Sequence, residues 1–339
     1  MTPKLFAGLT VAAGVSLAAA VTVYGTHNQW SSGSLSGAPV LPKLAERAND
    51  VAAIALRQGE KTLTLERRDG AWTLKERNAY PVRAEAVRSL VVRLAQARLA
   101  EKKTRKADRY RLLELEDPTD KDAKSRQVRL LGEDGKPIGE LVLGAKRYQA
   151  FGSGKAGSYV RLPGDEQTWL ANADVDVSLD VKDWVDRSVF KTDTSGVKSV
   201  VLALPGEPAF TIRRTEGAKG GFELADMPEG KKLKAGATFS SVPDAFASIE
   251  LEDLRKLAET PVGPKVSVAT FETQKGLTVT FRMRKEGNDH WLSLSATGIG
   301  DAKKTAQDLK QRAEGWEFKI PSWKAQALFK RKSEFFETS

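Results

Sequence analysis

Apolar and polar residues alternate along much of the chain after residue 50, a pattern typical of half-buried β-strands. In TLTLER (62–67), leucines alternate with threonines, and AWTLKE (71–76) follows as the expected return strand. Asp69-Gly70 stands between them, a pair that favours a tight hairpin turn because both positions tolerate positive φ. Helical spacing then begins near Arg83, with an apolar stripe formed by Val87, Leu90, Val91, Leu94 and Leu99. The first unit is therefore predicted as strands followed by an amphipathic helix.

Similar hairpins recur further along the chain. Turn pairs at Asp134-Gly135, Pro163-Gly164 and Gly287-Asn288 each separate two alternating segments. Three further segments show helical patterns and are predicted as helices: 177–190, 243–256 and 302–313.

The pattern of the first unit returns after a boundary at Asp-Thr-Ser-Gly (193–196). AFTIRR (209–214) matches TLTLER, and GGFELA (220–225) matches AWTLKE with Phe222 in place of Trp72. We interpret this as a diverged internal duplication, with one α+β repeat at 49–190 and a second at 191–339. The expected fold class is α+β, with antiparallel β-hairpin units that carry amphipathic helices on one face.

The amino terminus has a different character. Residues 5–25 form an apolar run without a charge, LFAGLTVAAGVSLAAAVTVYG, and about 20 helical residues cross a bilayer. With Lys4 as the charged flank, the run predicts a single-pass anchor with its N-terminus in the cytoplasm. The alternative is a cleaved signal peptide, because Ala18 and Ala20 give an A-x-A-like site. Under both interpretations the bulk of the chain lies in the periplasm, and the anchor places it at a bacterial inner membrane.

Residues 26–48 are predicted as a flexible tether. They are rich in Ser and Gly, and Pro39 and Pro42 disfavour a helix. A coil of this length reaches about 25 Å root-mean-square, enough to hold a folded body near the membrane surface. The chain contains no Cys, which excludes disulfides and a lipid attached through cysteine.

The charge of +10 and the pI near 9.5 indicate an anionic partner. For a chain held beside a bilayer, we expect lipid headgroups or an envelope polymer rather than nucleic acid. The alternative for the densest basic segment is a solvated helix end. The candidate residues for contact with an anionic surface are Lys102, Lys103, Arg105, Lys106, Arg109 and Arg111.

Four tryptophans, Trp72, Trp169, Trp291 and Trp316, each begin a returning strand. They could form an aromatic binding platform, but their recurrence at one place in each hairpin favours large core side chains.

The sequence lacks the patterns of the common catalytic and metal sites. Five aspartates lie in 174–186, but the EF-hand Gly and terminal Glu are missing. FGSGKAGS (151–158) departs from the phosphate-loop spacing and is followed by a predicted strand, so we interpret it as a hairpin connection. The two histidines, His27 and His290, are far apart in the sequence, and His290 is expected on the solvent face of a strand. We therefore expect no metal, no cofactor and no catalytic residues.

The chain resembles the domain-of-unknown-function family 4340. The resemblance rests on the N-terminal run and on VAAIALRQGEKTLTLERRDGAWTLKE (51–76), YPVRAEAVRSLVVRLAQARL (80–99) and YVRLPGDEQTWLANADVDVSLDVKDWVDRSVF (159–190). It implies a single-pass bacterial envelope protein of unknown activity, with similarity in some members to auxiliary parts of ABC transporter systems. These motifs are structural, so the resemblance supplies no site residues. GGFELA departs from the pattern because it lacks the Trp of its counterpart.

Together these features predict a membrane-anchored extracytoplasmic accessory or binding protein that is not an enzyme. Its expected partners are ABC transporter subunits or other envelope proteins. Two alternatives stay open: a protein that binds a lipid surface, and an envelope hydrolase that uses Asp and Glu.

Overall fold

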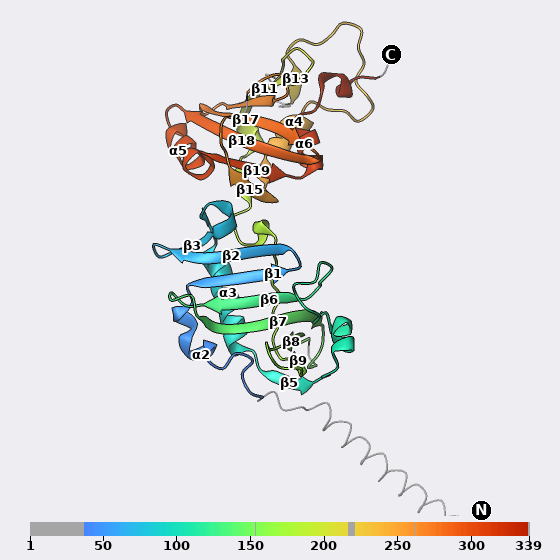
Figure 1. Cartoon of the computed structure of the whole chain (residues 1–339). Helices are drawn as coiled ribbons and strands as arrows, with labels where there is room; N and C mark the ends of the chain where they lie inside the picture. The colour runs from blue at the N-terminus through green and yellow to red at the C-terminus, as the bar shows by residue number, and fades with distance from the viewer. Residues whose placement is uncertain (1–36, 153, 216–220, 261, 338–339) are drawn as a thin grey trace, which may run out of the picture. The chain divides into compact units, whose positions relative to one another are not determined.

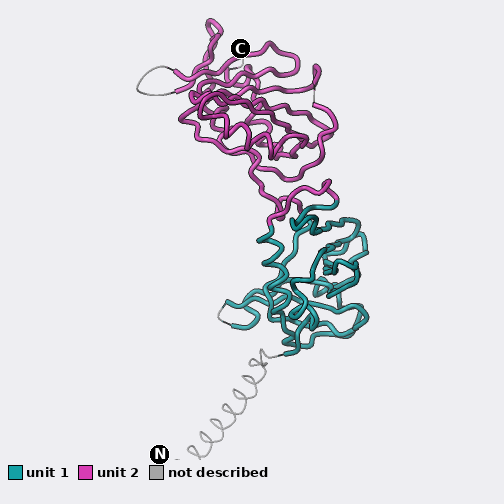
Figure 2. The backbone as a smooth tube through the Cα atoms, turned by 90° about the vertical axis from the view of Figure 1, so that its left-hand side faces the viewer, with its two compact units in different colours: residues 1–75, 84–179 teal, residues 76–83, 180–339 magenta. Residues whose placement is uncertain are grey.

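The computed structural model describes residues 37–152, 154–215, 221–260 and 262–337 (Figure 1). Contacts divide the chain into two compact units, coloured separately in Figure 2. Unit 1 contains the described residues up to Lys75 together with Ala84–Leu179, and unit 2 contains Glu76–Arg83 and the chain from Asp180 onward. The boundary predicted at 190/191 thus differs from the observed one, and a segment of the first predicted repeat, which includes β4 (Tyr80–Pro81), joins unit 2.

Unit 1 is built on one antiparallel sheet in which β1 pairs with both β2 and β6. Leu56 of β1 faces Leu63 on one side and Val128 on the other, so the buried positions form continuous rows. The strand order is β3 (Ala71–Leu74), β2 (Lys61–Arg68), β1 (Ala53–Gln58), β6 (Arg126–Leu131), β7 (Pro137–Arg147), β8 (Gly157–Arg161), β9 (Thr168–Ala171) and β5 (Leu99–Lys102).

Helix α3 (Ala84–Gln96) lies against one face of this sheet (Figure 1). Its buried residues Val87, Leu90, Val91 and Leu94 are those of the predicted stripe, which confirms this helix. The stripe ends earlier than predicted, because Leu99 opens strand β5 opposite Ala171. The short helix α2 (Leu44–Arg47) packs beside α3.

The predicted tether ends too late in the sequence. Val40, Leu41 and Leu44 are buried in unit 1, with exposed fractions of 1%, 5% and 0%. Burial of these apolar side chains holds residues 38–48 to the folded body. The anchor at 5–25 and the rest of the tether lie outside the described residues. Among the described residues, no helix is both long enough and apolar enough to span a membrane.

Unit 2 contains a second antiparallel sheet, drawn mainly in orange and red in Figure 1. The order of its eight strands corresponds to that of the eight unit 1 strands given above, with β11 in the place of β1 and β15 in the place of β5. The order is β13 (Phe222–Leu224), β12 (Phe210–Arg214), β11 (Val197–Ala203), β16 (Ser267–Thr273), β17 (Leu277–Glu286), β18 (Asp289–Gly298), β19 (Trp316–Ile320) and β15 (Asp253–Lys256). The antiparallel α+β prediction is confirmed.

The core of unit 2 is aromatic. Phe190 lies edge-on to Phe271 and Phe281, with ring centroids 5.7 and 5.3 Å apart, and Phe246 packs against the same two rings. Phe190 belongs to β10 (Ser188–Lys191), which pairs with β14 (Ser248–Glu250). Phe246 ends α4 (Ser241–Phe246), which contacts α6 (Ser322–Leu328).

Two predicted helices of unit 2 are wrong for most of their length. The segment 177–190 forms the single turn η4 (Val181–Asp183) and then β10, because Phe190 pairs with Ile249. The segment 243–256 is helical only up to Phe246, and Leu254 enters the sheet opposite Phe318. By contrast, α5 spans Ala302–Ala313 as predicted and packs on β17 and β18.

The tryptophans are mostly half-buried rather than core residues. Trp291 alone among the four is buried, with 8% of its surface exposed. Cations cover three of the four rings: Arg255 lies 3.9 Å from the centroid of Trp291, and Lys102 and Lys256 lie 5.5 and 4.3 Å from those of Trp169 and Trp316. The last two pairs occupy corresponding positions, each joining the last residue of β5 or β15 to the facing strand.

Candidate functional site

The predicted basic segment leaves β5 and runs into the 3-10 helix η3 (Ala107–Leu113). The structure divides its six residues into two groups. Lys102 is exposed but lies over the Trp169 ring, and the Lys103 ammonium pairs with Glu101 at 2.5 Å while its side chain is only 18% exposed. The other four cations, Arg105, Lys106, Arg109 and Arg111, are exposed.

Helix η3 is fixed to the sheet by its tyrosine. The Tyr110 hydroxyl donates a hydrogen bond of 2.6 Å to the Glu166 carbonyl, and the Arg161 guanidinium lies 5.0 Å from the Tyr110 ring centroid. Glu114 ends the helix with a φ of 55°, and its amide donates to the Arg111 carbonyl. The cations are therefore displayed from an ordered platform rather than from a loose loop.

Leu112 stands among these cations with 79% of its surface exposed. Two acidic residues offset part of the positive charge of these four cations: Asp108 lies within η3, and the Glu166 carboxylate is 3.9 Å from Arg105. We call Arg105, Lys106, Arg109, Arg111 and Leu112 the η3 surface. An exposed apolar side chain in a segment rich in cations can contact an anionic interface that has an apolar layer beneath it. The sequence indicated the charges, but the exposure of Leu112 required the fold.

The first described residues, 37–40, lie beside the start of strand β5, the strand that leads to η3. The Leu99 amide donates to the Ala38 carbonyl, and the Val40 amide donates to the Ala97 carbonyl, both at 2.9 Å. Gly37 fits closely here, because an added Cβ would lie 1.7 Å from the Leu99 oxygen. The first described residue, Gly37, therefore lies beside the β5 edge of unit 1.

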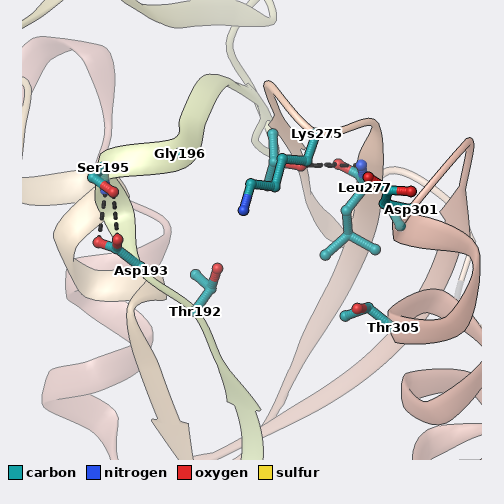
Figure 3. Close-up of a pocket in the computed structure, with 10 residues that line it drawn as sticks. Thr192, Asp193, Ser195, Gly196, Lys275, Leu277, Asp301 and Thr305 are labelled. Carbon is teal, nitrogen blue, oxygen red and sulfur yellow. Dashed lines mark hydrogen bonds between the residues drawn. The ribbon is translucent and has the colours of Figure 1, made fainter.

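A second candidate site is an open hollow of about 370 Å³ in unit 2. Three separate segments line it: 192–196, 273–277 and 301–305. Figure 3 shows Asp193 and Ser195 on one side, Asp301 and Thr305 on the other, and the Lys275 side chain between them. In unit 1 a short turn joins β8 to β9, whereas in unit 2 helix α5 lies between β18 and β19, so the hollow lies where the units differ. Sequence patterns did not identify this hollow.

The hollow has an ordered polar lining. The Ser195 hydroxyl and amide donate to the Asp193 carboxylate, and these hydrogen bonds lower the pKa of Asp193 below its ordinary value. Asp193 therefore stays ionised at neutral pH. Lys275 supplies a cation and Thr305 a hydroxyl. This arrangement can hydrogen-bond a small polar ligand, and its volume falls in the range of small-molecule sites.

Three of the five aspartates in 174–186 form ion pairs with basic side chains. Asp174 pairs with Lys146 at 2.5 Å, Asp176 pairs with Arg126, and Asp183 pairs with Arg187 at 2.5 Å. Within the described ranges, no group of three metal-ligating side chains is brought together.

His290 and Glu317 are titratable groups that the fold shields from water to different extents. His290 lies in strand β18 as predicted and is partly exposed, with its Nδ1 3.3 Å from the Ser322 hydroxyl. Burial lowers the pKa of His290, and the charge of Lys285 lowers it further. Glu317 is fully buried and accepts hydrogen bonds from Arg255 at 2.9 Å and Arg284 at 2.6 Å. Glu317 thus joins the two arginines in one buried ion-pair cluster.

These features define an α+β protein of two antiparallel units with a common strand order. Residues 72–269 match the family described as Domain of unknown function (DUF4340), and the chain belongs to this family. No curated protein and no solved structure matches the chain.

Proposed function

We propose that this chain is a single-pass, non-enzymatic accessory protein whose folded body lies outside the cytoplasm and binds another envelope protein. The apolar run at 5–25 carries the proposal, because it is long enough to cross a bilayer and contains no charge. The resemblance to envelope proteins, some of them similar to ABC transporter auxiliaries, makes subunits of such a transporter the expected partners.

The common strand order of the two sheets supports the further proposal that the body arose by internal duplication. The paired positions Lys102–Trp169 and Lys256–Trp316 support it as well. In unit 2, β13 and β15 stand at the two ends of the sheet. An end strand of an antiparallel sheet can accept a partner strand through backbone hydrogen bonds, which suits a binding role.

The test is crosslinking in intact membranes, followed by purification of the full chain and mass spectrometry of the attached proteins. The control is the double variant Val11→Arg/Val15→Arg, in which two charges interrupt the apolar run. We expect an envelope protein, such as an ABC permease or ATPase subunit, to be recovered with the natural chain and lost with the variant. Equal recovery from both chains, or no specific protein from the natural one, would contradict the proposal.

A further inference from the structure

We infer that the η3 surface binds the anionic headgroups of the membrane in which the chain is anchored. This inference rests on the proposed membrane anchor and adds a second, electrostatic contact between unit 1 and that membrane. The ligand class is anionic phospholipid, with the four exposed cations on the headgroups and Leu112 in the apolar layer beneath them.

The first support is the position of the surface relative to the chain entry. Residues 38–40 are hydrogen-bonded along 97–99, and β5 continues from Leu99 into the segment that carries η3. Residues 26–36 separate the apolar run from this entry point and can span at most about 40 Å even when fully extended. The covalent chain therefore keeps Gly37, beside the β5 edge of unit 1, within about 40 Å of the proposed anchor.

The second support is the chemistry of the surface. Arg105, Lys106, Arg109 and Arg111 are exposed, and of these Arg105 lies 3.9 Å from the exposed Glu166 carboxylate. Lys103 is engaged by Glu101, and Lys102 is exposed but lies over the Trp169 ring. Each cation near an anionic leaflet strengthens binding by about fivefold. Leu112 adds an apolar contact that a purely ionic polymer or nucleic acid would not use.

The third support is that the tether raises the fraction of molecules in which the η3 surface contacts the bilayer, even when that contact is weak. A surface of four cations and one leucine binds free vesicles only weakly, as single lipid-anchoring signals do. When the same surface is joined to the membrane by a short chain, its effective concentration at the bilayer is on the order of millimolar. Helix η3 is ordered by Tyr110 and Glu166, so binding does not require a loop to become ordered.

The absence of native cysteine allows a direct test on the full chain. The Leu112→Cys variant is labelled with an environment-sensitive fluorophore and reconstituted into vesicles of phosphatidylcholine, with or without phosphatidylglycerol at a ratio of roughly 7:3. Lipids carrying a quencher report contact of the label with the bilayer. Lys136→Cys, whose side chain is 83% exposed in the β6–β7 turn, is the label control.

We expect quenching at position 112 in the anionic vesicles, little in phosphatidylcholine alone, and a loss of quenching at high salt. Adding Arg109→Gln/Arg111→Gln should lower the contact equilibrium by about 30-fold. Lys303→Gln/Lys304→Gln, which removes two exposed cations from α5, should leave it unchanged. Circular dichroism of each variant checks its folding.

The outcomes separate this inference from the proposal on which it rests. A chain that resists alkaline extraction from the vesicles while its 112 label stays in water would overturn the inference and leave the anchor intact. Equal quenching with and without phosphatidylglycerol would overturn the anionic headgroup as the ligand. Release of the chain by alkaline extraction would overturn the anchor itself, and with it the inference.

Discussion

Arg77 donates two hydrogen bonds of 2.8 Å to the carboxylate of Asp253, although the two residues are 176 positions apart in the sequence. The pairing belongs to unit 2, which includes Glu76–Arg83. In the same segment, Tyr80 lies edge-on to Trp316 with ring centroids 4.8 Å apart. A short stretch that sequence patterns assign to the first repeat is thus a structural part of unit 2.

This pairing predicts that Arg77→Ala destabilises unit 2. The two side chains are 29% and 30% exposed, and a two-pronged arginine–carboxylate pair is stronger than a single surface ion pair. We expect a loss of about 1–2 kcal/mol in the free energy of unfolding. Urea unfolding followed by circular dichroism measures it. Arg88→Ala, at a 73% exposed side chain on α3, should cost less than about 0.5 kcal/mol, and equal losses would contradict the role of Arg77.

Glu317→Gln should be more damaging. Glu317 is fully buried between Arg255 and Arg284, so removing its charge leaves two guanidinium groups with less compensation. We expect a loss of about 3 kcal/mol in the free energy of unfolding. The matched variant Glu286→Gln removes a 43% exposed partner of Arg255 and should cost about 0.5–1 kcal/mol. If Glu286→Gln were the more damaging change, Glu317 would not be the central charge of this cluster.

His290 should make stability depend on pH. The pKa of the His290 imidazole in the folded state lies below the ordinary value of 6.5, and burial is the largest cause of this shift. As the pH falls below 6.5, the unfolded chain takes up this proton first, so stability is lost between 6.5 and the folded-state pKa and is fully present above 6.5.

Nuclear magnetic resonance can follow the titration directly, because the chain has only two histidines. We expect one imidazole to titrate below 6.5, and its signal to disappear in His290→Gln. That variant should also flatten the pH dependence of stability in this window. A His290 midpoint at or above 6.5 would show that burial does not govern this side chain.

Gly37→Ala tests how the chain enters unit 1. An added Cβ would clash with the Leu99 carbonyl at 1.7 Å, so the pairing of 38–40 with 97–99 would have to shift. We expect a loss of about 1–3 kcal/mol in stability and faster amide exchange at Leu99. Gly196→Ala is the matched control, since nothing lies within 4 Å of its added Cβ. Unchanged exchange at Leu99 would mean that this pairing does not hold the entering chain.

Much of the sheet architecture was readable from local patterns. The Asp69-Gly70 turn is observed with φ of 50° and 80°, and the hairpins at Asp134-Gly135 and Gly287-Asn288 form as predicted. These features depend on neighbouring residues, so the sequence displays them directly. Helix α5 is predictable for the same reason, because its apolar positions recur at helical spacing.

The errors arose where distant residues decide the conformation. Phe190 and Leu254 lie in the segments 177–190 and 243–256, which were predicted as helices, but pairing with Ile249 and Phe318 makes both residues part of strands. Leu99 fits the stripe of α3, yet it pairs with Ala171. In each case, burial against a remote strand outweighs local spacing.

The candidate sites follow the same rule. The basic segment was visible because its residues are contiguous, but the engagement of Lys103 and the exposure of Leu112 depend on the fold. The hollow beside α5 draws on segments that begin at Thr192 and end at Thr305, and no local motif joins them.

The central claim is that the folded body lies outside the cytoplasm on an N-terminal anchor. The most direct measurement labels Lys136→Cys, the sole cysteine of that variant, with a membrane-impermeant maleimide in cells whose outer membrane alone is permeabilised. We predict labelling before lysis and recovery of the full-length chain in alkali-washed membranes. Labelling only after lysis, or recovery of the chain in the soluble fraction, would contradict the account.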